Sequence, residues 1–209
     1  MTSGSENIGR VGEVDLWLLH LDLPDPELSQ RWSDLSTAER ERADQLSRPE
    51  VRRRFIAARS GLRRVLASYL SVPPRSLEFF KGPQGKPALP GGPQFNLSHS
   101  DDLALCAVAH GRQVGIDLER LRRIPERDDI ARQWFREEER EAYHAESASR
   151  DSAFLRLWTR REAYLKAIGT GLAGLETSSA IDPERWEVHE LRPFDGYVGA
   201  LVVERILGS

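Results

Sequence analysis

Residues 113–119 read QVGIDLE, and this short stretch predicts a strand that carries two acids. Side chains alternate between the two faces of a β-strand, so Asp117 and Glu119 are expected on one face and the apolar residues on the other. Paired carboxylates offer the oxygen ligands that Mg²⁺ prefers, with water and substrate phosphate filling the remaining positions. A half-buried strand with a solvated polar face has the same pattern. This stretch alone therefore does not decide between a metal site and an ordinary polar strand face.

A helical pattern downstream of this strand, over residues 152–168, supplies a third acid. Glu162 and Lys166 are four residues apart and so lie on one helical face. An exposed ion pair worth a few tenths of a kcal/mol has the same spacing. Gly169 follows, where a positive φ can end the helix.

Upstream, residues 95–100 read FNLSHS and place His99 between Ser98 and Ser100. Two hydroxyls, an imidazole and nearby backbone N–H groups suit an anion such as phosphate. A loop histidine in a turn is the alternative, because serine is also a turn residue. Residues 85–87, GKP, add Lys86, which also fits a turn.

The order of the predicted elements indicates an α+β protein made of two halves of roughly a hundred residues each. The predicted strands lie at 14–21, 77–80 and 103–109 in the first half, and at 113–119, 186–190 and 197–204 in the second, with helices between them. The opening MTSGSENIGR is predicted to be a frayed tail.

Composition limits the classes of protein. The chain has 209 residues, 39% of them hydrophobic, and a net charge of -3. It has no apolar stretch long enough to span a bilayer and no secretory signal, so we expect a protein that does not bind membranes. Cys106 is the only cysteine, which excludes an internal disulfide and a cysteine-based zinc site and fits a reducing, cytoplasmic setting.

The segments GKP, FNLSHS, GIDLE and W-T-x-x-E-A-x-x-K (158–166), taken in this order, resemble the 4′-phosphopantetheinyl transferases, specifically the larger single-chain type that activates surfactin synthetase. The resemblance covers roughly residues 35–175. It implies two similar α/β-sandwich halves, residues 1–110 and 111–209, related by a pseudo-twofold, with the active site at their interface, where ligand sites commonly lie. It also implies a monomer. The implied reaction transfers the phosphopantetheine arm of coenzyme A to a serine hydroxyl of an acyl or peptidyl carrier protein and releases 3′,5′-ADP.

The resemblance also implies roles for individual residues. Mg²⁺, with Mn²⁺ as the alternative ion, is held by Asp117, Glu119 and Glu162, and Lys166 stabilises the phosphate charge. The general base is Glu162 or Glu139, the Glu of an F-x-x-x-E segment, and the resemblance does not choose between them. The residues implied at coenzyme A are Arg42, Arg59 and His99 at the 3′-phosphate, Lys86 and Ser98 near the nucleotide, and Lys166. Arg161 departs from the family pattern, which usually has Lys there.

A run of arginines follows the acidic strand and predicts a docking surface for an acidic carrier protein. With this run we group Trp134 and Phe135. A solvated loop and helix face is the alternative. The arginines are Arg120, Arg122, Arg123, Arg127, Arg132 and Arg136.

Three other functions remain open from the sequence. The chain could bind coenzyme A without transferring anything, although all the expected acids and Lys166 are present. A nucleic-acid-binding protein would be basic, whereas this chain has a pI near 6.0 and we expect no nucleic acid partner. A metal-dependent nuclease of the D…(D/E)-x-K type would place its lysine two residues after the acid, not four.

Overall fold

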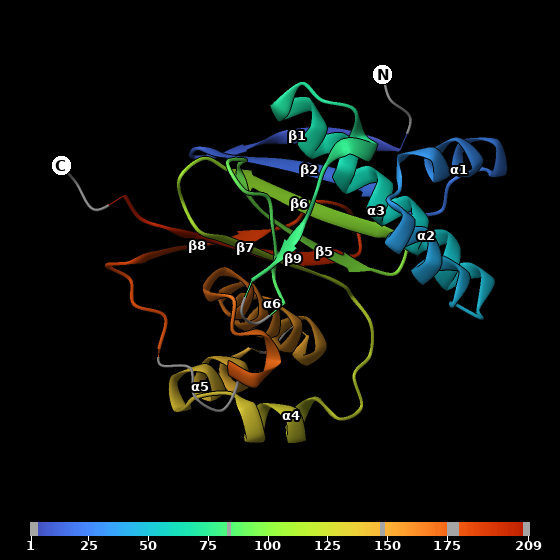
Figure 1. Ribbon diagram of the computed structural model, residues 1–209. Helices are drawn as coiled ribbons and strands as arrows, with labels where there is room; N and C mark the ends of the chain where they lie inside the picture. The colour runs from blue at the N-terminus through green and yellow to red at the C-terminus, as the bar shows by residue number, and fades with distance from the viewer. Residues whose placement is uncertain (1–3, 83–84, 147–148, 175–179, 207–209) are drawn as a thin grey trace.

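The computed structural model describes residues 4–82, 85–146, 149–174 and 180–206, and confirms an α+β fold (Figure 1). Its first sheet has four antiparallel strands in the order β1-β2-β6-β5. Helices α1 to α3 lie between β2 and β5 in the chain. The bounds are β1 Ser5–Val11, β2 Val14–His20, α1 Asp25–Arg31, α2 Thr37–Asp44, α3 Pro49–Leu70, β5 Gln94–Ser100 and β6 Leu103–Ala109.

A second sheet of three antiparallel strands follows, in the order β7-β9-β8. Three helices lie between β7 and β8 in the chain. The bounds are β7 Val114–Arg120, α4 Arg127–Trp134, α5 Glu137–Ala145, α6 Arg150–Ile168, β8 Trp186–Leu191 and β9 Tyr197–Glu204. Short 3₁₀ turns occur at Trp32–Asp34, Pro74–Ser76 and Gly171–Gly174, and a two-residue hairpin pairs β3 Phe80–Lys81 with β4 Pro87–Ala88.

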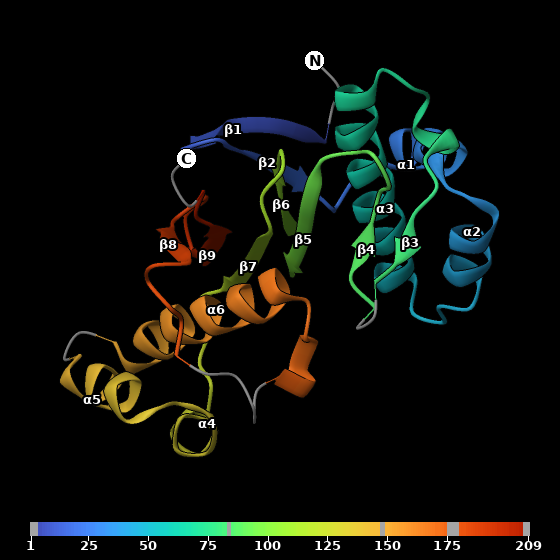
Figure 2. The same ribbon diagram turned by 60° about the vertical axis from the view of Figure 1, so that its left-hand side comes forward.

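The layers run in the order α3, first sheet, second sheet, α6 (Figure 2). Strand β6, LALCAVA, shows why, because it is buried along its whole length. Leu103, Leu105 and Ala107 pack between the two sheets, whereas Ala104 and Cys106 belong to the cluster against α3. Burial on both faces requires a continuous apolar run rather than alternation.

Two predictions about the N-terminal half are wrong. Residues Ser5–Val11 are not a frayed tail but strand β1, paired with the outer edge of β2. Its side chains are mostly exposed, so it lacks the alternating pattern by which a strand is recognised. The strand predicted at 77–80 shrinks to Phe80–Lys81. Residues 94–100, for which a turn around His99 was the alternative interpretation, form strand β5.

Among the described residues, no helix is both long and apolar enough to cross a membrane.

Candidate active site

Strand β7 presents its two acids toward α6. Its apolar residues pack into the cluster between the sheets, which leaves Asp117 and Glu119 on the opposite face, as the alternation predicts. Both acids line a cavity of about 340 Å³. The residues around it are Leu97, Ser98, His99, Asp117, Leu118, Glu119, Trp158, Glu162 and Lys166.

Gly115 explains how close α6 comes to this strand. A Cβ atom at position 115 would lie 2.0 Å from the carbonyl oxygen of Ala163 and 2.3 Å from the backbone nitrogen of Ala167. Only glycine allows that approach. Because Glu162 and Lys166 are on the same part of α6, the contact sets their distance from the acids of β7.

Asp117 is the most buried acid of the cavity. Its Oδ1 accepts hydrogen bonds from Lys166 Nζ at 2.5 Å and from Ser98 Oγ at 2.7 Å. Its Oδ2 is buried and has no hydrogen-bond partner among the described residues. Burial raises the pKa of this carboxyl, although Lys166 and Ser98 oppose the shift.

The other two acids are more accessible. Glu119 Oε2 accepts hydrogen bonds from Ser100 Oγ at 2.9 Å and from Arg122 Nη1 at 2.8 Å. Burial, followed by the charge of Asp117, raises the pKa of Glu162. Three carboxylates and one ammonium thus share a small cavity, and repulsion among the acids favours a cation between them.

Strand β5 is linked to β7 by side-chain hydrogen bonds. Side chains of β5, rather than its backbone, accept from alternate backbone N–H groups of β7. Asn96 Oδ1 accepts from Ile116 at 2.9 Å, Ser98 Oγ from Leu118 at 3.3 Å and Ser100 Oγ from Arg120 at 3.1 Å. These roles of Asn96 and Ser100 were not predicted from the sequence. Their period of two within FNLSHS is the signal that indicates a strand face.

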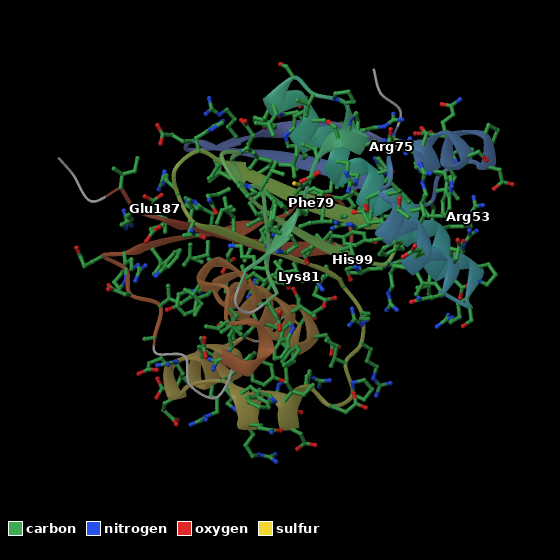
Figure 3. The ribbon with its side chains drawn as sticks, in the orientation of Figure 1. Arg53, Arg75, Phe79, Lys81, His99 and Glu187 are labelled. Atoms are coloured by element: carbon green, nitrogen blue, oxygen red, sulfur yellow. The ribbon has the colours of Figure 1, made fainter. Side chains whose placement is uncertain are left out.

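A larger cavity of about 550 Å³ adjoins the acidic one, and Leu97 and His99 line both. It brings together Arg42, Arg59 and His99 from α2, α3 and β5, three residues that the sequence analysis grouped at one phosphate. Figure 3 shows His99 near the end of β5, far from Glu187 on β8. The remaining lining is largely apolar: Leu21, Leu46, Val51, Phe55, Ala58, Leu62, Pro87, Phe95 and Leu97 with Asn96, Asp101 and Arg54.

The cations of this cavity differ in how firmly they are held. Arg59 donates from Nε and Nη2 to Glu39 Oε1 at 2.8 and 2.6 Å. Arg54, which the sequence analysis missed, pairs with Asp22 and Asp101. Arg42 is exposed, and its only hydrogen bond among the described residues is a long one to Gln45 at 3.5 Å. The cavity therefore holds two anchored guanidinium groups and one that can move.

His99 is the residue common to both cavities. Partial shielding from water, followed by the charge of Lys166, lowers the pKa of its imidazole. An anion bound beside it would favour the protonated form.

Lys86 and Glu139 lie outside this group. Lys86 Nζ donates to the carbonyl oxygens of Val114 at 2.9 Å and Ala167 at 3.2 Å, and thereby links β7 to α6. Glu139 Oε2 accepts from the backbone of Arg136 at 2.9 Å and from Arg161 Nη1 at 3.2 Å. It lines a separate cavity of about 260 Å³.

No group of three or more His, Cys, Asp or Glu side chains gathers closely enough to hold a metal ion among the described residues. The donor set nevertheless fits a hard cation. Asp117 Oδ2 is a buried carboxylate oxygen without a hydrogen-bond donor, and Glu119 and Glu162 line the same cavity. Carboxylates are the ligands that Mg²⁺ takes together with phosphate oxygens.

The chain is similar in sequence to proteins of one known superfamily. A sequence model described as the 4′-phosphopantetheinyl transferase superfamily matches residues 113–197, which include β7 and α6. The 4′-phosphopantetheinyl transferase HetI of a Nostoc species is 41% identical over 207 residues, covering 91% of this chain and 87% of its own. The chain belongs to this superfamily.

The 4′-phosphopantetheinyl transferase gsp of Aneurinibacillus migulanus is similar over a shorter stretch. It is 38% identical over 112 residues, which cover 53% of this chain and 46% of the relative. The similarity to named transferases identifies this protein as an enzyme of the same kind. The two adjoining cavities are therefore the active-site candidates of this transferase.

Proposed function

We propose that this transferase moves the 4′-phosphopantetheine arm of coenzyme A onto the serine hydroxyl of an apo carrier protein. The observation that carries the proposal is the pair of adjoining cavities with His99 on both, one apolar with several cations and the other acidic. Coenzyme A also has two unlike parts, a nucleotide with a 3′-phosphate and a pyrophosphate that leads to the arm. The nucleotide fits the first cavity and the pyrophosphate fits the second.

The larger cavity suits the nucleotide because it combines apolar walls with guanidinium groups. Arg42, Arg59 and His99 can pair with the 3′-phosphate, and charge-assisted hydrogen bonds from guanidinium to phosphate are strong. Arg54 adds charge on the same wall. We assign no nucleotide contact to Lys86 or Ser98, because Lys86 binds backbone carbonyls and Ser98 supports Asp117.

The acidic cavity suits a displacement at phosphorus. The serine oxygen forms a bond to the phosphorus that carries the arm, the pyrophosphate P–O bond breaks, and 3′,5′-ADP leaves with the electron pair. Asp117, Glu119 and Glu162 would hold Mg²⁺, or Mn²⁺ in its place, which neutralises phosphate charge when bound. Lys166, held at 2.5 Å from Asp117, can stabilise the charge on the leaving side.

The serine must also lose a proton. Glu162 lines the acidic cavity, where the serine must approach the phosphorus, and one of its two carboxylate oxygens can accept the proton while the other binds the metal. Glu139 is occupied with Arg161 and the first turn of α5. We therefore favour Glu162 over Glu139 as the acceptor of that proton.

The carrier protein would dock on the segment that follows β7. Arg122 and Arg123 are exposed cations directly after β7, and Leu121 beside them is 40% exposed. Phe135 does not belong to this surface, contrary to our prediction, because it is 3% exposed and stacks on Phe154. Its aromatic ring stabilises the cluster beneath α4 and α5 instead.

The type of transferase, the division into halves, the oligomeric state and the location of the protein are also part of the proposal. Motifs spread over both halves favour the larger single-chain type of transferase, with halves 1–110 and 111–209 related by a pseudo-twofold. A monomer in the cytoplasm fits that type.

The test is to incubate the protein with Mg²⁺, coenzyme A and an apo carrier protein and to weigh the carrier by intact-mass spectrometry. We expect a phosphopantetheine mass gain that is lost in Asp117→Ala and Glu162→Ala. Asp129→Ala is the matched control, because Asp129 is an exposed acid paired only with Arg132 among the described residues. No gain over a panel of carriers, with coenzyme A still bound, would favour a binding protein without transferase activity.

A further inference from the structure

In the described part of the chain, two cations pair with the acids of the cavity, and they are held very differently. Lys166 contacts Asp117 from α6 and also donates to Ser98 at 3.0 Å. Arg122 contacts Glu119 at 2.8 Å from the irregular segment after β7, and its side chain is 54% exposed. Lys166 is therefore anchored by a helix and a second bond, whereas Arg122 is tethered loosely.

Little besides Glu119 restrains Arg122. Its other hydrogen bond among the described residues is a long one of 3.5 Å to the carbonyl oxygen of Arg120. Exposed ion pairs of this kind are weak, and a competing cation can replace the arginine at small cost. Glu119 keeps its bond from Ser100 in either case.

We propose that Arg122 is a displaceable counter-ion of Glu119 that competes with the metal ion and is freed for the acidic carrier protein when the metal binds. The inference rests on the proposed function, because it takes Glu119 as a metal ligand. The guanidinium pairs with Glu119 Oε2 at 2.8 Å, and a cation bound at either oxygen of that carboxylate weakens the pair because the two positive charges repel. Arg122 then points its charge at the surface where the carrier docks.

Such competition has a necessary consequence. If metal binding frees Arg122 and the carrier binds freed Arg122, then each ligand tightens the binding of the other by the same factor. The transferase would thereby recognise its carrier best when the metal is already in place.

The chain offers a matched control in Arg123. It is exposed, carries the same charge one residue away, and makes no ion pair or hydrogen bond among the described residues. A general loss of positive charge near the metal would affect Arg122 and Arg123 variants alike. Competition for Glu119 affects Arg122 alone.

The first experiment titrates MgCl₂ into the full chain, without coenzyme A or carrier, by isothermal titration calorimetry. We expect Arg122→Gln to bind Mg²⁺ roughly twofold to fivefold more tightly than the wild type, as the worth of an exposed ion pair suggests. Arg123→Gln should stay close to the wild type. An unchanged dissociation constant in Arg122→Gln, or equal tightening in Arg123→Gln, overturns the competition.

A second titration tests the coupling with a carrier whose modified serine is replaced by alanine, so that no transfer occurs. Mg²⁺ should tighten carrier binding to the wild type and do so less in Arg122→Gln. An equal Mg²⁺ effect in both proteins overturns the coupling. A wild type that binds no Mg²⁺ in the absence of coenzyme A overturns this inference, whereas the intact-mass transfer assay tests the proposed function separately.

Discussion

At the scale of single residues, the candidate active site contains a buried carboxylate whose charge lowers the stability of the fold. Asp117 is buried beside Glu119 and Glu162, and burial raises its pKa despite the contact with Lys166. A raised carboxyl pKa means that the charged form is less favourable in the folded protein than in the unfolded chain. The stability cost is present at neutral pH and is relieved as the pH falls through the folded pKa.

Asp117→Asn should therefore separate stability from activity. The neutral amide avoids the cost of the buried charge, so without added metal at pH 7 we expect a Tm equal to or above that of the wild type. Transfer to the carrier should fall by at least roughly 100-fold, because a ligand of the proposed metal ion is lost. Thermal unfolding and intact-mass assays measure the two effects.

The exposed Asp129→Asn serves as the control and should change neither quantity. A clear drop in Tm for Asp117→Asn would show that its pair with Lys166 stabilises the fold more than burial opposes it.

Lys86 is a second residue whose charged form is less favourable in the folded protein than in the unfolded chain. Burial lowers its pKa from 10.5 to about 8, so between these two values the unfolded chain binds a proton that the folded protein does not. Stability from this group therefore rises with pH over about 8 to 10.5. Relative to Lys86→Met, the wild type should gain about 1–2 kcal/mol in the free energy of unfolding across that window, less than the full linkage value because the side chain is partly exposed.

Denaturant unfolding of both proteins at several pH values measures this difference. A constant difference between the wild type and Lys86→Met would mean that the ammonium stays charged on the carbonyls of Val114 and Ala167 throughout.

At the scale of elements, the site depends on how α6 lies on β7. Gly115 permits the contact with Ala163 and Ala167. Strand β5 supports the other side of β7 with three side chains rather than a backbone ladder. The acids of β7 are thus fixed by close packing on one side and by polar bonds on the other.

Gly115→Ala should disrupt this arrangement. The added methyl would lie 2.0 Å from a carbonyl oxygen of α6, so the helix must move away and take Glu162 and Lys166 with it. Overpacking of this kind costs about 1–3 kcal/mol or more. We expect lower stability and a loss of transfer activity.

Gly61→Ala in α3 is the control for this substitution. Its added Cβ would meet only the end of the Leu19 side chain, at 3.0 Å, and alanine is favoured over glycine within a helix. It should change stability by about 1 kcal/mol or less and leave transfer intact. Equal damage by both substitutions would contradict the special role of the contact between β7 and α6.

These elements also show what the sequence could and could not predict. The alternation in QVGIDLE and the spacing of Glu162 and Lys166 each predict a shared face, and the structure places all four residues on one cavity. No sequence pattern predicts that Lys86 reaches two backbone carbonyls, because that contact depends on how distant segments pack. Strand β1 was missed for a related reason, since pairing along the edge of β2, and not burial, stabilises it.

At the scale of the whole molecule, the two cavities join parts of the chain that are far apart in sequence. The cationic cavity is formed by α2, α3 and β5, and the acidic one by β5, β7 and α6. Strand β5 is common to both, with Leu97 and His99 on each cavity. A substrate that spans the two cavities must contact segments of both sheets at once. Coenzyme A would do so with its nucleotide in one cavity and its pyrophosphate in the other.

A comparison of the binding of coenzyme A with that of 3′-dephospho-coenzyme A tests whether the 3′-phosphate lies in the cationic cavity. Arg59 is held by Glu39 through Nε and Nη2, which leaves Nη1 available to the cavity. Arg59→Ala should weaken coenzyme A binding roughly 10-fold to 100-fold, as expected for a lost hydrogen bond to a charged group, and should affect the dephospho form little. Glu39 keeps its pair with Arg63 at 2.6 Å, so the fold should persist.

Arg53→Ala is the control. Arg53 lies on the same helix but pairs with Asp25 and is away from the cavity lining (Figure 3), so this variant should leave both affinities unchanged. Calorimetric titration of both ligands into the three proteins measures the preference, and an unaltered preference in Arg59→Ala would move the 3′-phosphate out of this cavity.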